Sequence, residues 1–210
     1  MNRTTEGIVR RKSSTIQGLS KFNKLVVLSA PSGTGKSTLA SMLLKKHPQA
    51  FEVSISYTTR LPRGKEKNGV NYFFISDVKF QTMVKSREFL EYAFVYGRHW
   101  YGTAKVVVEK ILSDGKNVLF DIDVQGAKQL KKIYKNHCIT IFVLPPSMEE
   151  LERRLKKRKT DSIAAIKVRL KTAQKEIQNA TTFDYQLINH ELEKTYKELE
   201  IILKKEKCLK

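Results

Sequence analysis

Short apolar runs alternate along the chain with stretches in which apolar residues recur every three or four positions. The runs cover residues 25–28, 118–120, 139–144 and 187–188, and continuous apolar runs of this length are typical of strands buried on both faces. The helical spacing is carried by Leu39, Met42 and Leu43, by Ala127, Leu130 and Ile133, by Ile163, Ile166, Leu170, Ala173 and Ile177, and by Leu192, Tyr196, Leu199 and Leu203. This alternation predicts an α/β fold with a parallel sheet flanked by helices.

Residues 54–103 interrupt the alternation. They hold more than half of the aromatic residues of the chain, in short β-like pieces separated by glycine-containing turns. We therefore expect an inserted, mixed β-rich subdomain there. A second interruption begins at Pro145, and beyond it Ser147 and Glu150 have the spacing of a capping box that opens a helix. This predicts a helical hairpin that projects from the sheet.

These signals divide the chain into a core, an insertion, a lid and a tail. The predicted core comprises residues 24–53, 104–144 and 181–210, the insertion 54–103, and the lid with its connecting helix 145–180. Residues 1–23 are basic and serine-rich without an apolar period, which predicts a disordered tail. A mitochondrial-type transit peptide has a similar composition and is the alternative.

Composition narrows the class of protein without deciding its function. The 210 residues are 40% hydrophobic, which is enough for a substantial core, and no apolar run reaches the roughly 18 residues of a membrane span. With only two cysteines, we expect a reducing, cytoplasmic compartment and no disulfide scaffold. The net charge of +19 comes mainly from scattered lysines, so we expect neither a specific nucleic-acid partner nor a membrane partner.

One segment, residues 30–38, carries the most specific chemistry in the chain. It reads Ala-Pro-Ser-Gly-Thr-Gly-Lys-Ser-Thr between a predicted buried strand and a predicted helix, which is the setting of a loop that wraps nucleotide phosphates. Gly33 and Gly35 allow backbone N–H groups to point inward, Lys36 can reach the β- and γ-phosphates, and the Ser37 hydroxyl can bind Mg²⁺. Alanine stands where the usual pattern has its first glycine. The predicted phosphate loop comprises Ala30, Pro31, Ser32, Gly33, Thr34, Gly35, Lys36, Ser37 and Thr38.

Two carboxylates follow the predicted strand 118–120. Asp121 and Asp123 are two residues apart, so both side chains should point to one side at the carboxyl edge of the sheet, beside the phosphate loop. They suit Mg²⁺ ligation or contact with a second substrate. A helix N-cap is the simpler explanation, above all for Asp123.

Arginine is a minority among the 40 basic residues, and several arginines stand where an anion could be bound. Arg60 and Arg63 lie three residues apart and near Tyr72, which fits a phosphate clamp. The predicted hairpin carries Arg154, Arg158 and Arg169, of which the first two share one helix face. Ordinary surface charges are the alternative explanation for both groups.

Taken together, the motifs from residue 25 to the C-terminus resemble those of the guanylate kinase family. They read, in order, Ser-Gly-Thr-Gly-Lys-Ser-Thr, Ser-x-Thr-Thr-Arg-x-Pro-Arg, Asn-Gly-Val-x-Tyr-x-Phe, Glu-Tyr-Ala, Tyr-Gly-Thr, Asp-Ile-Asp-x-Gln-Gly and Leu-Pro-Pro-Ser-Met-Glu-Glu-Leu. The resemblance implies a P-loop core that binds ATP, an inserted subdomain that binds GMP, and a helical lid. It also implies Mg²⁺-dependent transfer of a phosphoryl group from ATP to GMP or dGMP. We expect a monomer or a homodimer.

The resemblance further implies roles for individual residues. Guanine would be held by Ser56, Glu91 and Thr103, and the GMP phosphate by Arg60, Arg63, Tyr72 and Tyr101. Asp121 would lie with Ser37 near the metal, Asp123 would lie on the GMP side, and Asn189 matches an asparagine near the adenine. The implied catalytic set is Lys36, Arg60, Asp121, Arg154, Arg158 and Arg169.

Three other functions are alternatives at this point. The first is a guanylate-kinase-like module that has lost catalysis and binds a protein, against which the intact Lys36 and Ser37 argue. The second is a related kinase that acts on a sugar bisphosphate, against which Glu91 and Ser56 argue. The third is a basic nucleic-acid binder, whose affinity would fall steeply with salt.

Overall fold

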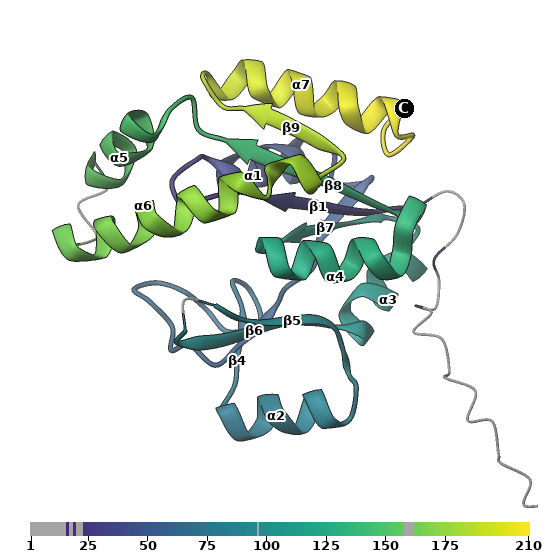
Figure 1. Cartoon of the computed structure of the whole chain (residues 1–210). Helices are drawn as coiled ribbons and strands as arrows, with labels where there is room; N and C mark the ends of the chain where they lie inside the picture. The colour runs from purple at the N-terminus through teal and green to yellow at the C-terminus, as the bar shows by residue number, and fades with distance from the viewer. Residues whose placement is uncertain (1–15, 17–18, 20–22, 96, 158–161) are drawn as a thin grey trace, which may run out of the picture.

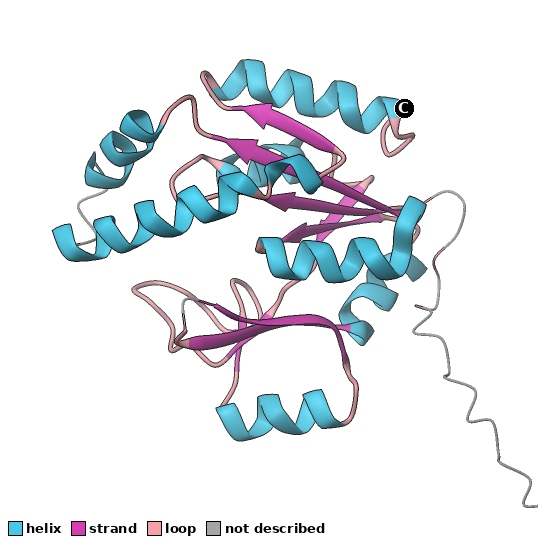
Figure 2. Cartoon of the chain, viewed as in Figure 1, coloured by secondary structure: helices cyan, strands magenta, loops and turns pink. Residues whose placement is uncertain are grey.

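The computed structural model describes residues 16, 19, 23–95, 97–157 and 162–210. It contains two β-sheets with helices packed around them, as Figures 1 and 2 show. The larger sheet has five strands in the order β2 (Phe51–Val53), β7 (Asn117–Asp121), β1 (Leu25–Ser29), β8 (Cys138–Leu144) and β9 (Tyr185–Ile188). All of its strand pairs are parallel. The predicted α/β fold with a parallel sheet is therefore confirmed.

Both faces of this sheet are covered by helices, because each central strand is apolar on both sides. On β1, Val26 and Leu28 pack with α1 (Lys36–Lys46) and α7 (Leu192–Lys205), whereas Leu25 and Val27 pack with α3 (Lys105–Ser113) and α4 (Val124–Tyr134). Successive side chains of a strand point to opposite faces, so an unbroken apolar run needs a core on each side. This layering brings the carboxyl ends of β1 and β7 together, where Leu28 pairs with Asp121.

The smaller sheet is mixed and has four strands in the order β4 (Phe73–Phe74), β3 (Tyr57–Thr58), β6 (His99–Ala104) and β5 (Phe89–Val95). Strands β3 and β4 run parallel, and the other pairs are antiparallel. The helix α2 (Asp77–Lys85) packs Phe80 and Met83 against this sheet, on the side away from the larger sheet in Figure 1. The β-rich insertion is thus present as a separate sheet with a small core of its own.

The helical hairpin consists of α5 (Met148–Lys157) and α6 (Ile163–Gln178), and the remaining short helices are η1 (Lys135–His137) and η2 (Ala180–Thr182). Leu151, Leu155 and Ile166 belong to the apolar cluster that joins α5 to α6. The Glu150 N–H donates to Ser147 Oγ at 3.2 Å, which is the first half of the expected capping box. The Glu150 carboxylate pairs instead with arginines of α5.

Three described residues of the predicted tail, Ile16, Leu19 and Asn23, contact the core. Ile16 is only 3% exposed and belongs to a core cluster with Val108 and Leu112, and Leu19 packs against the same cluster. Asn23 is buried and its Nδ2 donates to the Leu112 carbonyl at 3.2 Å. Apolar side chains favour such burial, which removes their surface from water. The other residues of the 1–23 segment lie outside the described part, and the predicted domain boundaries stay predictions.

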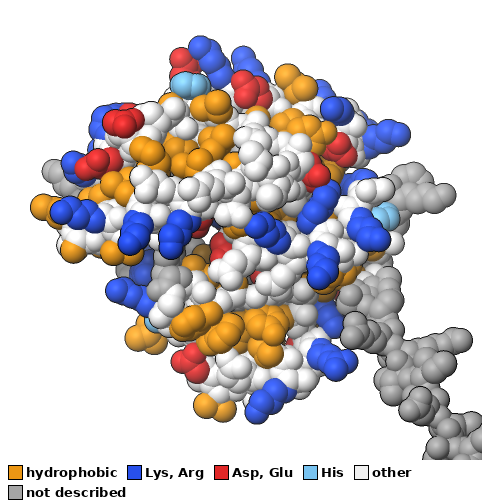
Figure 3. Space-filling model, in the orientation of Figure 1, with side chains coloured by type: hydrophobic (Ala, Val, Ile, Leu, Met, Phe, Trp, Pro, Cys, Tyr) orange, Lys and Arg blue, Asp and Glu red, His pale blue; other side chains and the backbone are white. Residues whose placement is uncertain are grey.

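None of the helices in the described part of the chain has both the length and the apolar composition that a bilayer crossing requires. Figure 3 shows Lys and Arg side chains spread widely over the visible face, with acidic side chains among them.

The Asn117 side chain connects three parts of the core at the start of β7. Its Oδ1 accepts the Lys24 N–H at 2.8 Å, and its Nδ2 donates to the carbonyls of Ala50 and Cys208 at 3.0 Å each. Asn117→Ala leaves the partly buried N–H of Lys24 and the buried carbonyl of Cys208 without this partner. We expect it to lower the free energy of unfolding by about 2–4 kcal/mol.

Urea denaturation measures this loss. Asn136→Ala is the matched control, because Asn136 is exposed and surface substitutions change stability by less than about 0.5 kcal/mol. Equal denaturation midpoints for the two variants would show that the Asn117 side chain does not hold these segments together.

Candidate functional site

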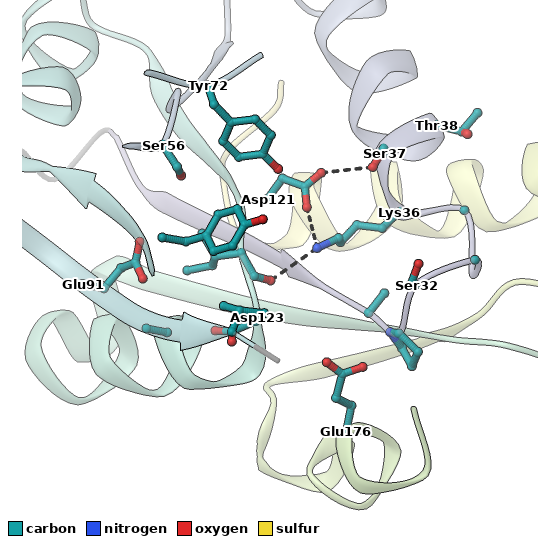
Figure 4. Close-up of a pocket in the computed structure, with 18 residues that line it drawn as sticks. Ser32, Lys36, Ser37, Thr38, Ser56, Tyr72, Glu91, Asp121, Asp123 and Glu176 are labelled. Carbon is teal, nitrogen blue, oxygen red and sulfur yellow. Dashed lines mark hydrogen bonds and ion pairs between the residues drawn. The ribbon is translucent and has the colours of Figure 1, made fainter. Parts of the chain in front are cut away.

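A cavity of about 300 Å³ lies between the carboxyl ends of β1 and β7 and the smaller sheet, and Figure 4 shows it with its lining. Residues from both sheets contribute, so one space joins the core to the inserted subdomain. Among the residues expected at the site, its lining includes Ala30, Pro31, Ser32, Gly33, Gly35, Lys36, Ser37, Thr38, Ser56, Tyr72, Glu91, Tyr101, Asp121 and Asp123. Thr34, Arg60, Arg63, Thr103, Arg154, Arg169 and Asn189 are outside this lining.

The phosphate loop connects β1 to α1 and depends on two glycines. Gly33 and Gly35 have φ of 101° and 100°, a left-handed conformation that favours glycine. Neighbours also crowd both positions, since a Cβ on Gly33 would lie 3.0 Å from Leu155 and one on Gly35 would lie 2.5 Å from the Asn189 amide nitrogen. Thr34 is fully buried and donates its hydroxyl to the Pro31 carbonyl at 2.8 Å. These contacts hold the loop in a defined shape.

Alanine at position 30 does not strain this loop. Among the described residues other than glycine, positive φ angles occur only at Arg87, Lys135 and Lys207. Ala30 therefore has a backbone conformation that any L-residue can adopt, which is the condition under which we expect alanine to be tolerated there.

Lys36, Ser37 and Asp121 form a connected polar group at the floor of the cavity. The Lys36 ammonium forms an ion pair with Asp121 Oδ1 and donates to the Ile122 carbonyl at 3.4 Å. Ser37 Oγ donates to the other carboxylate oxygen of Asp121 at 3.2 Å. A hydroxyl and a carboxylate side by side are oxygen ligands of the kind that Mg²⁺ binds while it keeps water or phosphate oxygens as further ligands. Within the described residues, no group of three or more His, Cys, Asp and Glu is set to hold a metal by itself.

Asp123 has a structural function that the sequence left as an alternative. It is the N-cap of α4, and its Oδ1 accepts the Gly126 N–H at 2.9 Å. Because Asp123 also lines the cavity, the cap and a contact with a ligand are compatible, since a carboxylate has further lone pairs.

Glu91, Thr103 and Ser56 form a buried polar cluster on the side of the smaller sheet. Glu91 is 3% exposed, lies opposite Thr103 across β5 and β6, and accepts the Thr103 hydroxyl at 2.7 Å. The Ser56 and Thr103 hydroxyls are 3.2 Å apart. Burial raises the pKa of Glu91 to about 7, and the Thr103 hydrogen bond opposes this shift while nearby Asp123 adds to it. The cluster thus places beside the cavity a carboxyl group with a pKa near 7, which when ionised can accept hydrogen bonds from N–H groups.

Arg60 is buried beside the aromatic rings expected to share its function. Its guanidinium binds both carboxylate oxygens of Glu66 at 2.8 and 3.0 Å, donates to the Tyr101 hydroxyl at 3.1 Å, and lies 5.3 Å from the centre of the Tyr72 ring. The pKa of Arg60 is raised and that of Glu66 is lowered, mainly through this hydrogen-bonded pair. Arg63 is exposed, and its backbone N–H donates to Glu66 at 2.7 Å.

Two arginines of the hairpin contact the phosphate loop. Arg154 donates to the Thr34 carbonyl of the loop at 3.5 Å, and also to the Asn189 carbonyl at 3.0 Å and to Glu150 at 2.7 Å. Arg169 donates to Ser32 Oγ at 2.6 Å. Arg158, the third arginine expected there, lies outside the described residues.

The Asn189 side chain is hydrogen-bonded to the backbone of the phosphate loop. Its Nδ2 donates to the Thr34 carbonyl at 2.6 Å, its Oδ1 accepts the Thr195 hydroxyl at 3.2 Å, and the residue is 4% exposed. Its amide is therefore committed to the loop and to α7, and a contact with adenine stays a prediction.

Two carboxylates of this region, Glu66 and Glu176, were missed in the sequence analysis. Glu176 of α6 lines the cavity, and burial raises its pKa to about 7, with Lys36 lowering and Asp123 raising it. The sequence held a signal for each of them. Glu66 is the only acidic residue in the basic segment 60–67, which indicates an ion pair. Glu176 is next to Ile177, a residue of the predicted apolar helix face, which indicates partial burial.

A second hollow of about 250 Å³ adjoins the cavity and shares Val95, Asp123 and Glu176 with it. Lys128 of α4 and Lys175 of α6 also line this hollow. Positive charge beside the cavity favours the approach of anions such as nucleotides.

Comparison with known proteins agrees with this geometry. Residues 22–206 match the sequence model of the family described as Guanylate kinase. A guanylate kinase of Porphyromonas gingivalis is 49% identical over 171 residues, covering 81% of this chain and 91% of that protein. One of Rickettsia prowazekii is 49% identical over 184 residues, covering 88% of this chain and 92% of that protein.

Structural comparison leads to the same family. The crystal structure of guanylate kinase from Anaplasma phagocytophilum matches with a TM-score of 0.73 at 33% sequence identity, covering 91% of this chain and 89% of that one. Sequence identity over most of both chains and a shared fold support one conclusion: the protein described here belongs to the guanylate kinase family.

Proposed function

We propose that this chain transfers the γ-phosphoryl group of ATP to GMP or dGMP in an Mg²⁺-dependent reaction that yields ADP and the diphosphate. The observation that carries the proposal is that one cavity has the phosphate loop with Lys36 on one wall and the buried Glu91 on another. A donor phosphate chain and an acceptor base can therefore be bound in a single space. We further propose that the protein acts in the cytoplasm as a monomer or homodimer, with no specific nucleic-acid partner and no membrane partner.

On the donor side, the phosphate loop and its lysine bind the phosphates of ATP. Backbone N–H groups of the loop and the N-terminus of α1 favour negative charge. The Lys36 ammonium exchanges its ion pair with Asp121 for the β- and γ-phosphate oxygens. Ser37 and Asp121 are the residues that would hold Mg²⁺, which when bound offsets the charge that develops on the phosphates.

On the acceptor side, the Glu91 cluster recognises the edge of guanine. Guanine presents N1–H and the N2 amino group side by side, and one ionised carboxylate can accept both. The hydroxyls of Ser56 and Thr103, which are 3.2 Å apart, can supply a donor to O6. Adenine has an acceptor at N1 and no amino group at C2, so the base would offer the buried carboxylate no donor and would leave it with the Thr103 hydroxyl alone.

The phosphate of the acceptor is bound by Arg60, Arg63, Tyr72 and Tyr101. Arg60 is held in place by Glu66 and Tyr101 before any ligand arrives, so little side-chain entropy is lost when the phosphate binds. Arg154, Arg158 and Arg169 act on the transferring group, and closure of the hairpin excludes water from it.

Acceptor preference tests the proposal directly. In a coupled assay of ADP formation with GMP, dGMP, AMP, CMP and UMP, we expect GMP and dGMP to be used and AMP to be strongly rejected. Lys36→Ala is the control, with kcat lower by on the order of 10³-fold or more because it removes charge stabilisation from the transferring group. Use of AMP at least as well as GMP would overturn the proposal.

Glu91→Gln tests guanine recognition through its pH dependence. The raised pKa leaves the carboxylate protonated below about pH 7, so the GMP affinity of the wild type should be full above that pH and fall about tenfold per unit below it. The variant should bind GMP at least about tenfold more weakly at pH 8, with the ATP KM nearly unchanged and a narrower GMP/AMP preference. The GMP phosphate titrates in both proteins, so the difference between their pH profiles isolates Glu91.

The pH dependence of the free energy of unfolding tests the raised pKa of Glu91 independently of GMP binding. A pKa raised by folding contributes stability that is present below the unfolded value and lost as the pH rises through the folded value, here about 7. Glu91→Gln should therefore be more stable than the wild type at pH 8, by up to about 3 kcal/mol, and lose this advantage near pH 4. Glu88→Gln, at an exposed position just before the same strand, should show neither effect, and identical profiles for both variants would contradict the assignment.

Two single substitutions test whether the arginines of the inserted subdomain and those of the hairpin have different functions. Arg63→Ala should raise the GMP KM more than it lowers kcat, since this arginine belongs to the inserted subdomain. Arg169→Ala should lower kcat more than it raises either KM, because Arg169 contacts the phosphate loop at Ser32. Steady-state kinetics with each substrate varied separately checks both, and an unchanged kcat for Arg169→Ala would contradict the proposed role.

A further inference from the structure

Gly126, in the first turn of α4, lies directly against the Glu91 carboxylate. A Cβ built on Gly126 would overlap Glu91 Oε2 and would lie 3.1 Å from both Glu91 Cδ and Ile122 Cδ1. Real Cβ atoms do not approach an oxygen so closely. The volume that a side chain at position 126 would fill is thus the volume that the Glu91 carboxylate occupies.

Backbone conformation does not explain the glycine. The described glycines with positive φ are Gly33, Gly35, Gly64, Gly69, Gly97 and Gly115, and Gly126 lies in a regular helix. Glycine is also a poorer helix former than alanine, by up to about 1 kcal/mol in a helix interior and less in a first turn such as this one. Close approach of Glu91 therefore accounts for the glycine, at some expense to the helix.

The backbone of β5 cannot easily move away from α4 to relieve such an overlap. The Gln129 side chain of α4 donates to the Tyr92 carbonyl at 2.8 Å and accepts the Tyr92 N–H at 3.3 Å. On its other edge β5 pairs with β6, where Glu91 is opposite Thr103. Both edges of β5 are thus held beside Glu91. A side chain at position 126 would displace the flexible end of Glu91, which is its carboxylate.

We propose that Gly126 is a positioning residue that sets guanine selectivity. Its missing side chain lets the Glu91 carboxylate lie where it accepts the Thr103 hydroxyl and faces the cavity, a wall that Figure 4 shows with Glu91 and Asp123. Helix α4 packs on the larger sheet, so the base-recognition group of the inserted subdomain is aligned by the core. This inference rests on the proposed function, because it takes GMP as the acceptor.

Gly126→Ala is the variant that tests this position. We expect the GMP KM to rise at least about tenfold, because displacement of the carboxylate costs one hydrogen bond to a charged group. The preference for GMP over AMP should become smaller. The ATP KM should stay within about twofold, and kcat at saturating GMP should change less than the GMP KM, since the donor side is untouched. The melting temperature should change little, because alanine favours the helix while displacement of the Glu91 carboxylate costs its hydrogen bond to Thr103. Lys132→Ala, at an exposed position of the same helix, is the control and should leave all of these unchanged.

A double substitution shows whether the effect passes through Glu91. Glu91→Asp retracts the carboxylate by one methylene and leaves room for the Cβ, so adding Gly126→Ala to it should change the GMP KM by less than about threefold. If the fold-changes in GMP KM caused by the two single substitutions multiply in the double variant, the inference is overturned.

The structure of the Gly126→Ala protein provides a readout that does not depend on GMP turnover. We expect the Glu91 carboxylate to be displaced from the Thr103 hydroxyl, and a carboxylate that keeps its place would overturn the inference. A wild-type protein that uses GMP with a Gly126→Ala variant of normal GMP KM would refute the inference alone. A wild-type protein that does not use GMP would refute the proposed function, and the displacement would still decide the placement of Glu91.

Discussion

The shape of the phosphate loop depends on close packing behind it, and much of the rest of the structure supplies that packing. Gly33 leaves room for Leu151 and Leu155 of α5, and Gly35 leaves room for the Asn189 amide. Asn189 in turn bonds to the Thr34 carbonyl. The hairpin and the segment between β9 and α7 therefore meet on one short loop. A change in the hairpin can reach the phosphate loop through this packing, because close-packed atoms transmit displacement.

The lining of the cavity is mainly acidic, although the chain as a whole is strongly basic. Among the described lining residues, only Lys36 is cationic, whereas Glu91, Asp121, Asp123 and Glu176 are acidic. Burial raises the pKa of both glutamates to about 7. Carboxylates gathered in a partly buried space favour ligands that bring positive charge or N–H donors, and Mg²⁺ and guanine do so. The net charge of +19 favours the approach of anions in general, whereas the acidic lining favours cationic groups and N–H donors inside the cavity.

The core sheet and the phosphate loop could be predicted from sequence because both depend on local pattern. An unbroken apolar run such as 25–28 has one stable solution, a strand covered on both faces, and the Gly-x-Gly-Lys-Ser segment requires the turn it forms. Ile16 could not be placed in this way, since isolated apolar residues in a basic segment carry no period. The pairing of Arg60 with Glu66 was also missed, although its signal was present in the charge pattern of a single loop.

The sequence by itself determined which side chains to expect at the cavity, since Lys36, Ser37, Asp121 and Glu91 are named by motifs of a few residues each, and all four line it. Only the tertiary structure decided how they are aligned. Asn189 meets Gly35, and Gly126 meets Glu91, across long stretches of chain, because parallel crossovers and the inserted sheet bring remote segments to one edge. Motifs specify a residue type at a position along the chain. Which atoms touch is set by packing, and packing depends on every element that shares the core.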